Sequence, residues 1–163
     1  MAGTETRAEA TSTRRDPSAW GQKPWRYMTA RDVMVREIVT VRTHDNLAQA
    51  AIKMLELGIR HLPVVDARRR LTGMLSDRDL RSAVGDPEFL LDTPQLRLRL
   101  DQRRVMDVMT RTPAVTDLDT PVEELARRLS EEKLGALLVV DQERRLLGIV
   151  SYVDVLRTIL TTP

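Results

Sequence analysis

The chain contains one pattern of residues twice at a constant spacing, and this internal repeat limits the possible folds more than any other feature. Asp32-Val33-Met34 recurs 75 positions later (107 − 32) as Asp107-Val108-Met109. The same offset holds without a gap for Leu62 with Leu137, Val64-Val65-Asp66 with Val139-Val140-Asp141, Arg69-Arg70-Leu71 with Arg144-Arg145-Leu146, Gly73 with Gly148, Ser76 with Ser151, and Asp79 with Asp154. A match of this length identifies two copies of one supersecondary unit.

Each copy has the hydrophobic pattern of an α/β (α+β) unit in the order strand, helix, strand, strand, helix. In the first copy, after a short helical turn, we predict strands over 39–42, 61–65 and 71–75, with helices over 46–57 and after Ser76. In the second copy the predicted strands are 114–116, 136–140 and 146–150, and the helices are 121–132 and a segment after Ser151. Because each copy has an apolar sheet face to cover, the two copies should pack on each other.

The same pattern divides the chain into a flexible N-terminal tail (1–28), a first repeat (29–84), a linker (85–104) and a second repeat (105–160). In the linker, leucines that alternate with arginines after Pro94 are compatible with a strand or an extended strap. Thr120, Pro121 and Glu123 have the spacing of an N-cap, a first helical proline and a capping box at the start of the second-copy helix.

Composition excludes several classes of site. The chain has no cysteine, which excludes disulfides, cysteine zinc sites and thiol catalysis, and two histidines make a metal site unexpected. No apolar run approaches the roughly 20 residues of a spanning helix, so we expect no membrane insertion and a cytoplasmic protein. Acidic residues interleave with the arginines and the net charge is +2, so we expect a solvated charged surface rather than a nucleic-acid surface.

Two segments of each copy resemble the CBS domain, the repeat named after cystathionine β-synthase. They are Gly58-Ile59-Arg60-His61-Leu62-Pro63-Val64-Val65-Asp66 and Gly73-Met74-Leu75-Ser76-Asp77-Arg78-Asp79, with counterparts in 133–141 and 148–154. The chain as a whole is similar to a stand-alone bacterial pair of such repeats, a Bateman module. The resemblance implies pseudo-twofold packing, a homodimer, clefts that bind AMP, ADP, ATP or S-adenosylmethionine, and a target protein that responds to the ligand.

By the same resemblance, the ligand-binding residues are Val39, Thr40, Arg60, His61, Leu62, Pro63, Ser76, Arg78, Asp79, Ala114, Val115, Ala136, Leu137, Ser151 and Asp154. In these roles, Asp79 accepts hydrogen bonds from ribose hydroxyls, and Ser76 contacts ribose or phosphate. Arg60 and His61 flank the adenine, and Leu62 and Pro63 form an apolar wall. Gly73 lets a ligand approach the backbone, and Arg78 reaches a phosphate.

Several of these assignments have a structural alternative. Ser76 and Asp79 also have the spacing of a capping box, Thr40 suits a strand by propensity, and Arg78 suits an exposed helix surface. Val115 stands where the first copy has Thr40, and Val153 where it has Arg78. The two sites are therefore not equivalent, and we expect the first copy to favour a phosphorylated ligand.

The leading hypothesis for function is a regulatory module that senses an adenosyl ligand and has no catalytic activity, cofactor or metal. One alternative is a structural or protein-docking module with degenerate pockets, in which Trp20, Trp25 and Tyr27 contact the partner. Another is nucleic-acid binding through the Arg-rich turns near Arg69 and Arg144. No nucleophile–base pair or phosphate-binding loop supports an enzyme.

Overall fold

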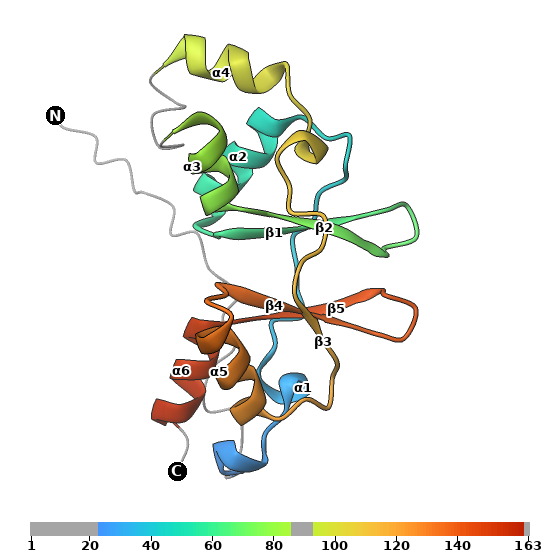
Figure 1. The fold of residues 1–163 in the computed structure, drawn as a ribbon, viewed down its shortest axis with the longest axis vertical. Coiled ribbons are helices and arrows are strands. Elements are labelled where there is room, and N and C mark those ends of the chain that lie inside the picture. The colour runs from blue at the N-terminus through green and yellow to red at the C-terminus, as the bar shows by residue number, and fades with distance from the viewer. Residues whose placement is uncertain (1–22, 86–92, 162–163) are drawn as a thin grey trace, which may run out of the picture.

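The computed structural model describes residues 23–85 and 93–161. They form two halves of similar construction, stacked one above the other (Figure 1). Each half has an antiparallel pair of strands, and its helices lie on the side of these strands that faces away from the other half. Most of the predicted tail, including Trp20, lies outside the described residues. Its last part contains a single 3-10 turn, η2 (Trp25–Tyr27).

The first repeat is built from α2 (Leu47–Leu57), β1 (His61–Val65), β2 (Leu71–Ser76) and α3 (Asp77–Val84). Helix α2 begins where the Asn46 side chain accepts a hydrogen bond from the Gln49 amide at 3.1 Å, and it ends at Gly58 in the left-handed conformation. Strands β1 and β2 are antiparallel, with His61 opposite Ser76. These elements confirm the predicted helix and hairpin.

The second repeat contains β3 (Val115–Thr116), α5 (Val122–Glu131), β4 (Ala136–Val140), β5 (Leu146–Ser151) and α6 (Tyr152–Thr161). Strand β3 is parallel to β4, which is antiparallel to β5. The predicted capping box is wrong, because Pro121 is the N-cap of α5 and makes no side-chain cap. The Thr120 hydroxyl instead donates to Asp117 Oδ1 at 2.9 Å.

The predicted strand over 39–42 is also wrong, since only Val41 pairs there, in an isolated parallel bridge with Val64. The reason is a proline. In the second repeat the Leu138 amide donates to the Ala114 carbonyl at 3.1 Å and extends the ladder. Pro63 stands at the position of Leu138 and has no amide hydrogen to donate, so the first-repeat ladder is shorter.

The two repeats are related by a pseudo-twofold axis and share a core. The Leu71 amide donates to the Arg144 carbonyl at 2.9 Å, and its counterpart Leu146 donates to the Arg69 carbonyl at 3.2 Å. An apolar cluster lies across this junction and contains, as its buried members, Val65, Leu71, Leu138 and Leu146. The predicted packing of the copies on each other is therefore confirmed.

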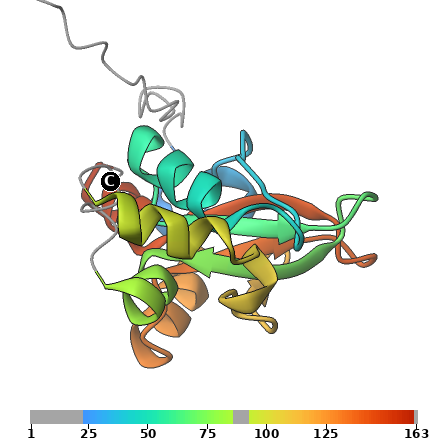
Figure 2. The ribbon, with the colours of Figure 1, turned by 90° about the horizontal axis from the view of Figure 1, so that it is seen from above.

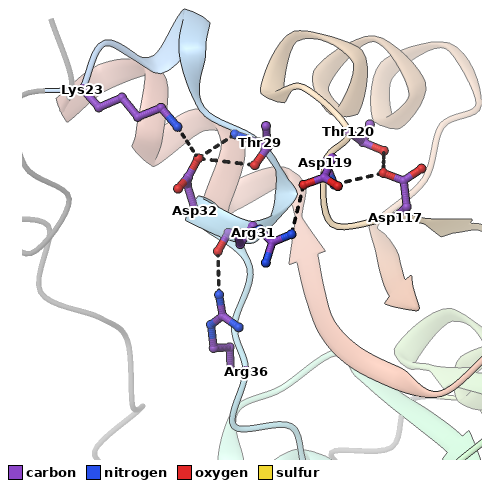
Figure 3. A network of polar contacts seen from close by, with 8 residues as sticks. All are labelled: Lys23, Thr29, Arg31, Asp32, Arg36, Asp117, Asp119 and Thr120. Atoms are coloured by element: carbon purple, nitrogen blue, oxygen red, sulfur yellow. Dashed lines mark hydrogen bonds and ion pairs between the residues drawn. The ribbon is translucent and has the colours of Figure 1, made fainter. Parts of the chain in front are cut away.

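The segment that enters each repeat packs on the opposite repeat. Helix α1 (Ala30–Val33), with Met28 and Met34, is buried in the core of the second repeat. The amides of Ala30 and Arg31 donate to carbonyls of the loop before α5, and Arg31 Nη2 lies 3.1 Å from Asp119 Oδ1 (Figure 3). We call residues 28–35 and 103–110 the entry segments.

The second entry segment repeats this arrangement on the first repeat. It contains a 3-10 turn, η4 (Val105–Asp107), and both Val105 and Met109 belong to the core around α2. The Val105 amide donates to the Asp45 carbonyl at 3.0 Å, as the Ala30 amide donates to the Thr120 carbonyl at 2.8 Å. The two repeats thus exchange their entry segments.

The linker contains a helix, α4 (Pro94–Asp101), rather than a strand or strap. Pro94 occupies its first turn, where the missing amide hydrogen costs nothing. The helix lies beside α2 (Figure 2), and Leu100 is fully buried in the first-repeat core. The Asp101 carbonyl accepts a hydrogen bond from Asn46 Nδ2 at 3.0 Å, which ties the helix to the start of α2.

Candidate ligand site

The start of β1 and the end of β2 bring several of the predicted site residues together in the first repeat. His61 lies opposite Ser76 in the ladder, and the Arg60 carbonyl accepts a hydrogen bond from the Asp77 amide at 3.0 Å. Asp79 follows in the first turn of α3. Arg60, His61, Ser76 and Asp79 therefore surround one end of the hairpin.

The Asp79 carboxylate has two different environments. Its Oδ2 accepts hydrogen bonds from the Ser76 amide at 2.8 Å and the Ser76 hydroxyl at 2.6 Å, which completes a capping box. Its Oδ1 faces the second entry segment, where the Thr110 hydroxyl lies 3.4 Å away. Capping uses one oxygen only, so the carboxylate can cap the helix and still accept a hydrogen bond from a ligand.

The equivalent carboxylate of the second repeat, Asp154, caps α6 in the same way. Its Oδ2 accepts from the Ser151 amide at 2.8 Å and from the Ser151 hydroxyl at 2.5 Å. The residue equivalent to Thr110 is Val35, whose side chain has no hydrogen-bond donor. The Thr110 hydroxyl next to the carboxylate therefore distinguishes the two sites. The sequence analysis did not identify Thr110, although the repeat offset pairs it with Val35.

The His61 ring lies against the second repeat. A Cβ atom added to Gly135 would lie 2.5 Å from His61 Nε2, so the imidazole packs directly on the Gly135 backbone. Burial lowers the pKa of His61, and the Arg60 charge lowers it further, while Asp79 and Asp77 oppose the shift. The ring is therefore neutral at neutral pH. It lies at the contact between the two repeats.

The remaining first-repeat residues lie in different surroundings. Val39 and Thr40 precede Val41, whose amide donates to the Pro63 carbonyl at 3.1 Å beside β1. Leu62 is fully buried in the core around α2, and Pro63 is buried as well. Arg78 is exposed on the first turn of α3. The predicted roles of these residues stay predictions.

In the second repeat, Ala136 and Leu137 are buried in β4, and Ala114 and Val115 are half-buried beside it. Val115 packs against the apolar cluster between the repeats, and its carbonyl accepts a hydrogen bond from Arg128 Nη1 at 2.8 Å. These four residues lie in β4 or beside it, and they are the counterparts of Val39, Thr40, His61 and Leu62.

The expectation that Gly73 leaves its backbone open to a ligand is wrong. A Cβ atom there would lie 2.7 Å from Met109 Sδ and 2.9 Å from the Thr110 carbonyl oxygen. Gly148 is covered in the same way by Met34. Glycine is needed at both positions because an entry segment, not a ligand, packs on the backbone.

The described residues contain no cluster of histidine, cysteine or carboxylate side chains that could hold a metal ion. Within 23–85 and 93–161, every helix is too short or too polar to cross a lipid bilayer.

Comparison with known proteins identifies the fold. Residues 30–86 and 105–161 match the family model of the CBS domain. The structure of the CBS-pair protein CBSX2 from Arabidopsis thaliana superposes with a TM-score of 0.72 at 30% identity, covering 82% of this chain and 94% of that one. The CBS domain pair of protein MJ0100, solved with 5′-methylthioadenosine and S-adenosyl-L-methionine, gives a TM-score of 0.66 at 25% identity, covering 80% and 94%.

Among curated relatives, a CBS domain-containing protein of Dictyostelium discoideum is 34% identical over 128 residues, which is 77% of this chain and 87% of the relative. A homoserine O-acetyltransferase of Methanohalobium evestigatum is 27% identical over 128 residues, and the match covers 78% of this chain but 23% of that enzyme. The matched region thus corresponds to one part of some larger proteins. From the two family matches and the shared fold, this chain belongs to the CBS domain family and carries a pair of CBS domains.

Proposed function

We propose that this CBS pair is a regulatory module that binds an adenosyl ligand and has no catalytic activity of its own. The candidates are AMP, ADP, ATP and S-adenosylmethionine. Two structural relatives support the class of ligand, since CBSX2 was solved in complex with AMP and MJ0100 with S-adenosyl-L-methionine. A cytoplasmic location is part of the same proposal.

The observation that carries the proposal is the position of Asp79 Oδ1. This oxygen is not used by the capping box and lies next to the Thr110 hydroxyl of the second entry segment. A ribose offers two adjacent hydroxyl groups, and a carboxylate accepts from both without a change of protonation. We therefore assign Asp79 as the ribose acceptor and Thr110, in the second entry segment, as its neighbour.

The charges near Asp79 favour a phosphorylated ligand at the first repeat. Arg60 and Arg78 are both exposed there, and guanidinium groups pair well with phosphate oxygens. Their counterparts are Gly135 and Val153, which carry no charge. The second site therefore takes a less charged adenosyl compound, or binds more weakly.

Signalling would require that the affinity for the ligand depends on how the two repeats are arranged. Asp79 and His61 belong to the first repeat, and the His61 ring packs on Gly135 of the second repeat. A ligand bound beside His61 therefore has a different affinity for different inter-repeat arrangements. Such a difference in affinity is what shifts a conformational equilibrium. A target protein would read that shift, and we propose that the module acts as a homodimer.

Thermal unfolding with each of the four ligands tests the proposal. A ligand at 100 times its Kd stabilises the folded state by about 2.7 kcal/mol, which raises the Tm by roughly 5–10 °C for a chain of this size. We expect Asp79→Asn to remove the increase for the phosphorylated ligands, and Thr110→Val to reduce it.

Asp154→Asn is the matched control, because it removes the same charge from the same kind of capping box in the second repeat. It should leave the increase caused by AMP or ATP in place. If none of the four ligands raises the Tm of the folded wild type, the proposal is wrong. If Asp154→Asn and not Asp79→Asn removes the effect of AMP, the assignment to the first repeat is wrong.

A further inference from the structure

The structure brings the two Arg-rich turns together. The turn between β1 and β2 contains Arg68, Arg69 and Arg70, and the turn between β4 and β5 contains Arg144 and Arg145. Both turns project from the same end of the molecule (Figure 1 and Figure 2). Arg70 and Arg145 form an antiparallel bridge, so residues 75 positions apart in the chain are neighbours. We call these five residues the arginine tip.

Most of the positive charge of this tip has no ion-pair partner. Arg145 pairs with Glu143 at 2.5 Å, whereas no ion pair joins the other four arginines to any described residue. The aspartates at the base of the turns are bound to backbone amides: Asp66 Oδ1 accepts from Arg68 and Arg70, each at 2.8 Å. Asp141 Oδ1 does the same for its own turn. All five arginines are exposed.

Two features of the tip are unfavourable for the isolated protein. Like charges placed directly opposite each other on neighbouring strands destabilise a sheet, and Arg70 and Arg145 are in this position. Arg69 and Arg144 also have left-handed backbone conformations, with φ of 62° and 60°, which glycine or asparagine adopts at lower cost. Arginine at these positions therefore costs stability, and its side chains offer a function that would offset this cost.

From this geometry we infer that the arginine tip binds the phosphodiester backbone of nucleic acid without sequence preference. A guanidinium group forms paired hydrogen bonds with phosphate oxygens. The ten turn residues, 66–70 and 141–145, include no aromatic residue to stack on a base, and Ala67 is the one apolar side chain. The tip therefore also lacks the apolar anchors of a protein interface or of a membrane-inserting segment.

Binding of a random-sequence 20-base-pair DNA duplex, followed by fluorescence anisotropy at several salt concentrations, tests this inference. Four unpaired arginines that contact phosphates give a slope of log K against log salt of about −3 to −4. Affinity should then fall roughly 100-fold between 50 and 200 mM salt. Single Arg68→Gln and Arg70→Gln variants should each make the slope less steep by about 1.

The quadruple change of Arg68, Arg69, Arg70 and Arg144 to Gln should abolish binding. Its matched control removes four exposed cations elsewhere, by changing Arg42, Lys53, Arg97 and Arg99 to Gln, and should bind within a few-fold of wild type. Circular dichroism checks that each variant is folded. Equal losses in both variants, or no binding to the duplex at 50 mM salt, would overturn the inference.

Two further probes separate the phosphodiester backbone from other polyanions. A poly-glutamate peptide and vesicles of phosphatidylcholine with phosphatidylserine present negative charge without a nucleic-acid backbone. We expect each to bind at least tenfold more weakly than the duplex. Tighter binding to either probe than to DNA would also overturn the inference. The proposed adenosyl site is tested separately, since neither outcome depends on Asp79.

Discussion

The contact between Met34 and Gly148 gives the sharpest test of the exchanged entry segments. A Cβ atom added to Gly148 would lie 2.8 Å from Met34 Cγ and 3.0 Å from Met34 Cβ, and closer still to the sulfur. Carbon atoms in contact normally stay about 3.5–4.0 Å apart. Met34 is 1% exposed and follows α1, so it has little room to move. The change Gly148→Ala therefore forces the entry segment away from β5.

The expected cost follows from core overpacking, which is typically about 1–3 kcal/mol. Alanine restricts the unfolded chain more than glycine does, and this offsets about 0.4–1 kcal/mol, since Gly148 has no left-handed φ. We expect a net loss of about 1 kcal/mol, equivalent to a Tm lower by about 2–4 °C. Met34→Ala alone should cost about 2–5 kcal/mol because it leaves a cavity.

Urea unfolding of wild type, both single variants and the double variant measures the coupling between the two positions. In the double variant the methyl group added at position 148 enters the space that Met34 leaves, so the total cost should be smaller than the sum by about 1–3 kcal/mol. Gly148→Ala combined with Met109→Ala is the control, because Met109 packs on Gly73 instead and should give additive costs. Additivity within about 0.5 kcal/mol for Met34 and Gly148 would refute the exchanged packing.

Two further predictions concern stability. Because burial and Arg60 lower the pKa of His61, the folded state takes up its proton less readily than the unfolded state, so stability should fall as pH drops from about 6.5 toward the folded pKa. Urea midpoints between pH 8 and 5 should show this loss for wild type and a smaller loss for His61→Gln; identical pH profiles would contradict the assignment. Lys133 has a left-handed φ of 53° where its counterpart Gly58 has 60°, so Lys133→Gly should raise stability by about 1 kcal/mol and Gly58→Lys should lower it by a similar amount. Thermal unfolding of the two variants checks the pair, and a destabilising Lys133→Gly would contradict the strain argument.

The sequence predicted those elements whose apolar residues recur at the repeat offset. The hairpins β1–β2 and β4–β5 and the helix α2 lie within a residue of their predicted bounds, because hydrophobic spacing and capping residues determine them locally. Two local errors had local causes: Pro63 shortens the first ladder, and Thr120 hydrogen-bonds within its own loop instead of capping α5. The sequence does not predict helix α4, because its Leu-Arg alternation has the period of a strand, while burial of Leu100 stabilises the helix.

What the sequence could not show was which repeat each entry segment packs on. Met34 and Met109 end the same repeated motif, and their spacing alone does not say which repeat each of them packs on. The same is true of the candidate site: Asp79 and Ser76 were identifiable by spacing, but Thr110 came from a distant part of the chain. The contact of His61 with Gly135 depends on the packing of two repeats and has no local pattern.

The exchanged entry segments make each half incomplete without the other. In a fragment that ends before residue 93, the apolar side chains of α1 would be exposed, because the second repeat that buries them is missing. The core around α2 would also lack Val105 and Met109. Apolar surface exposed in this way opposes folding of an isolated fragment. We therefore expect the two repeats to fold and unfold together, as one cooperative unit.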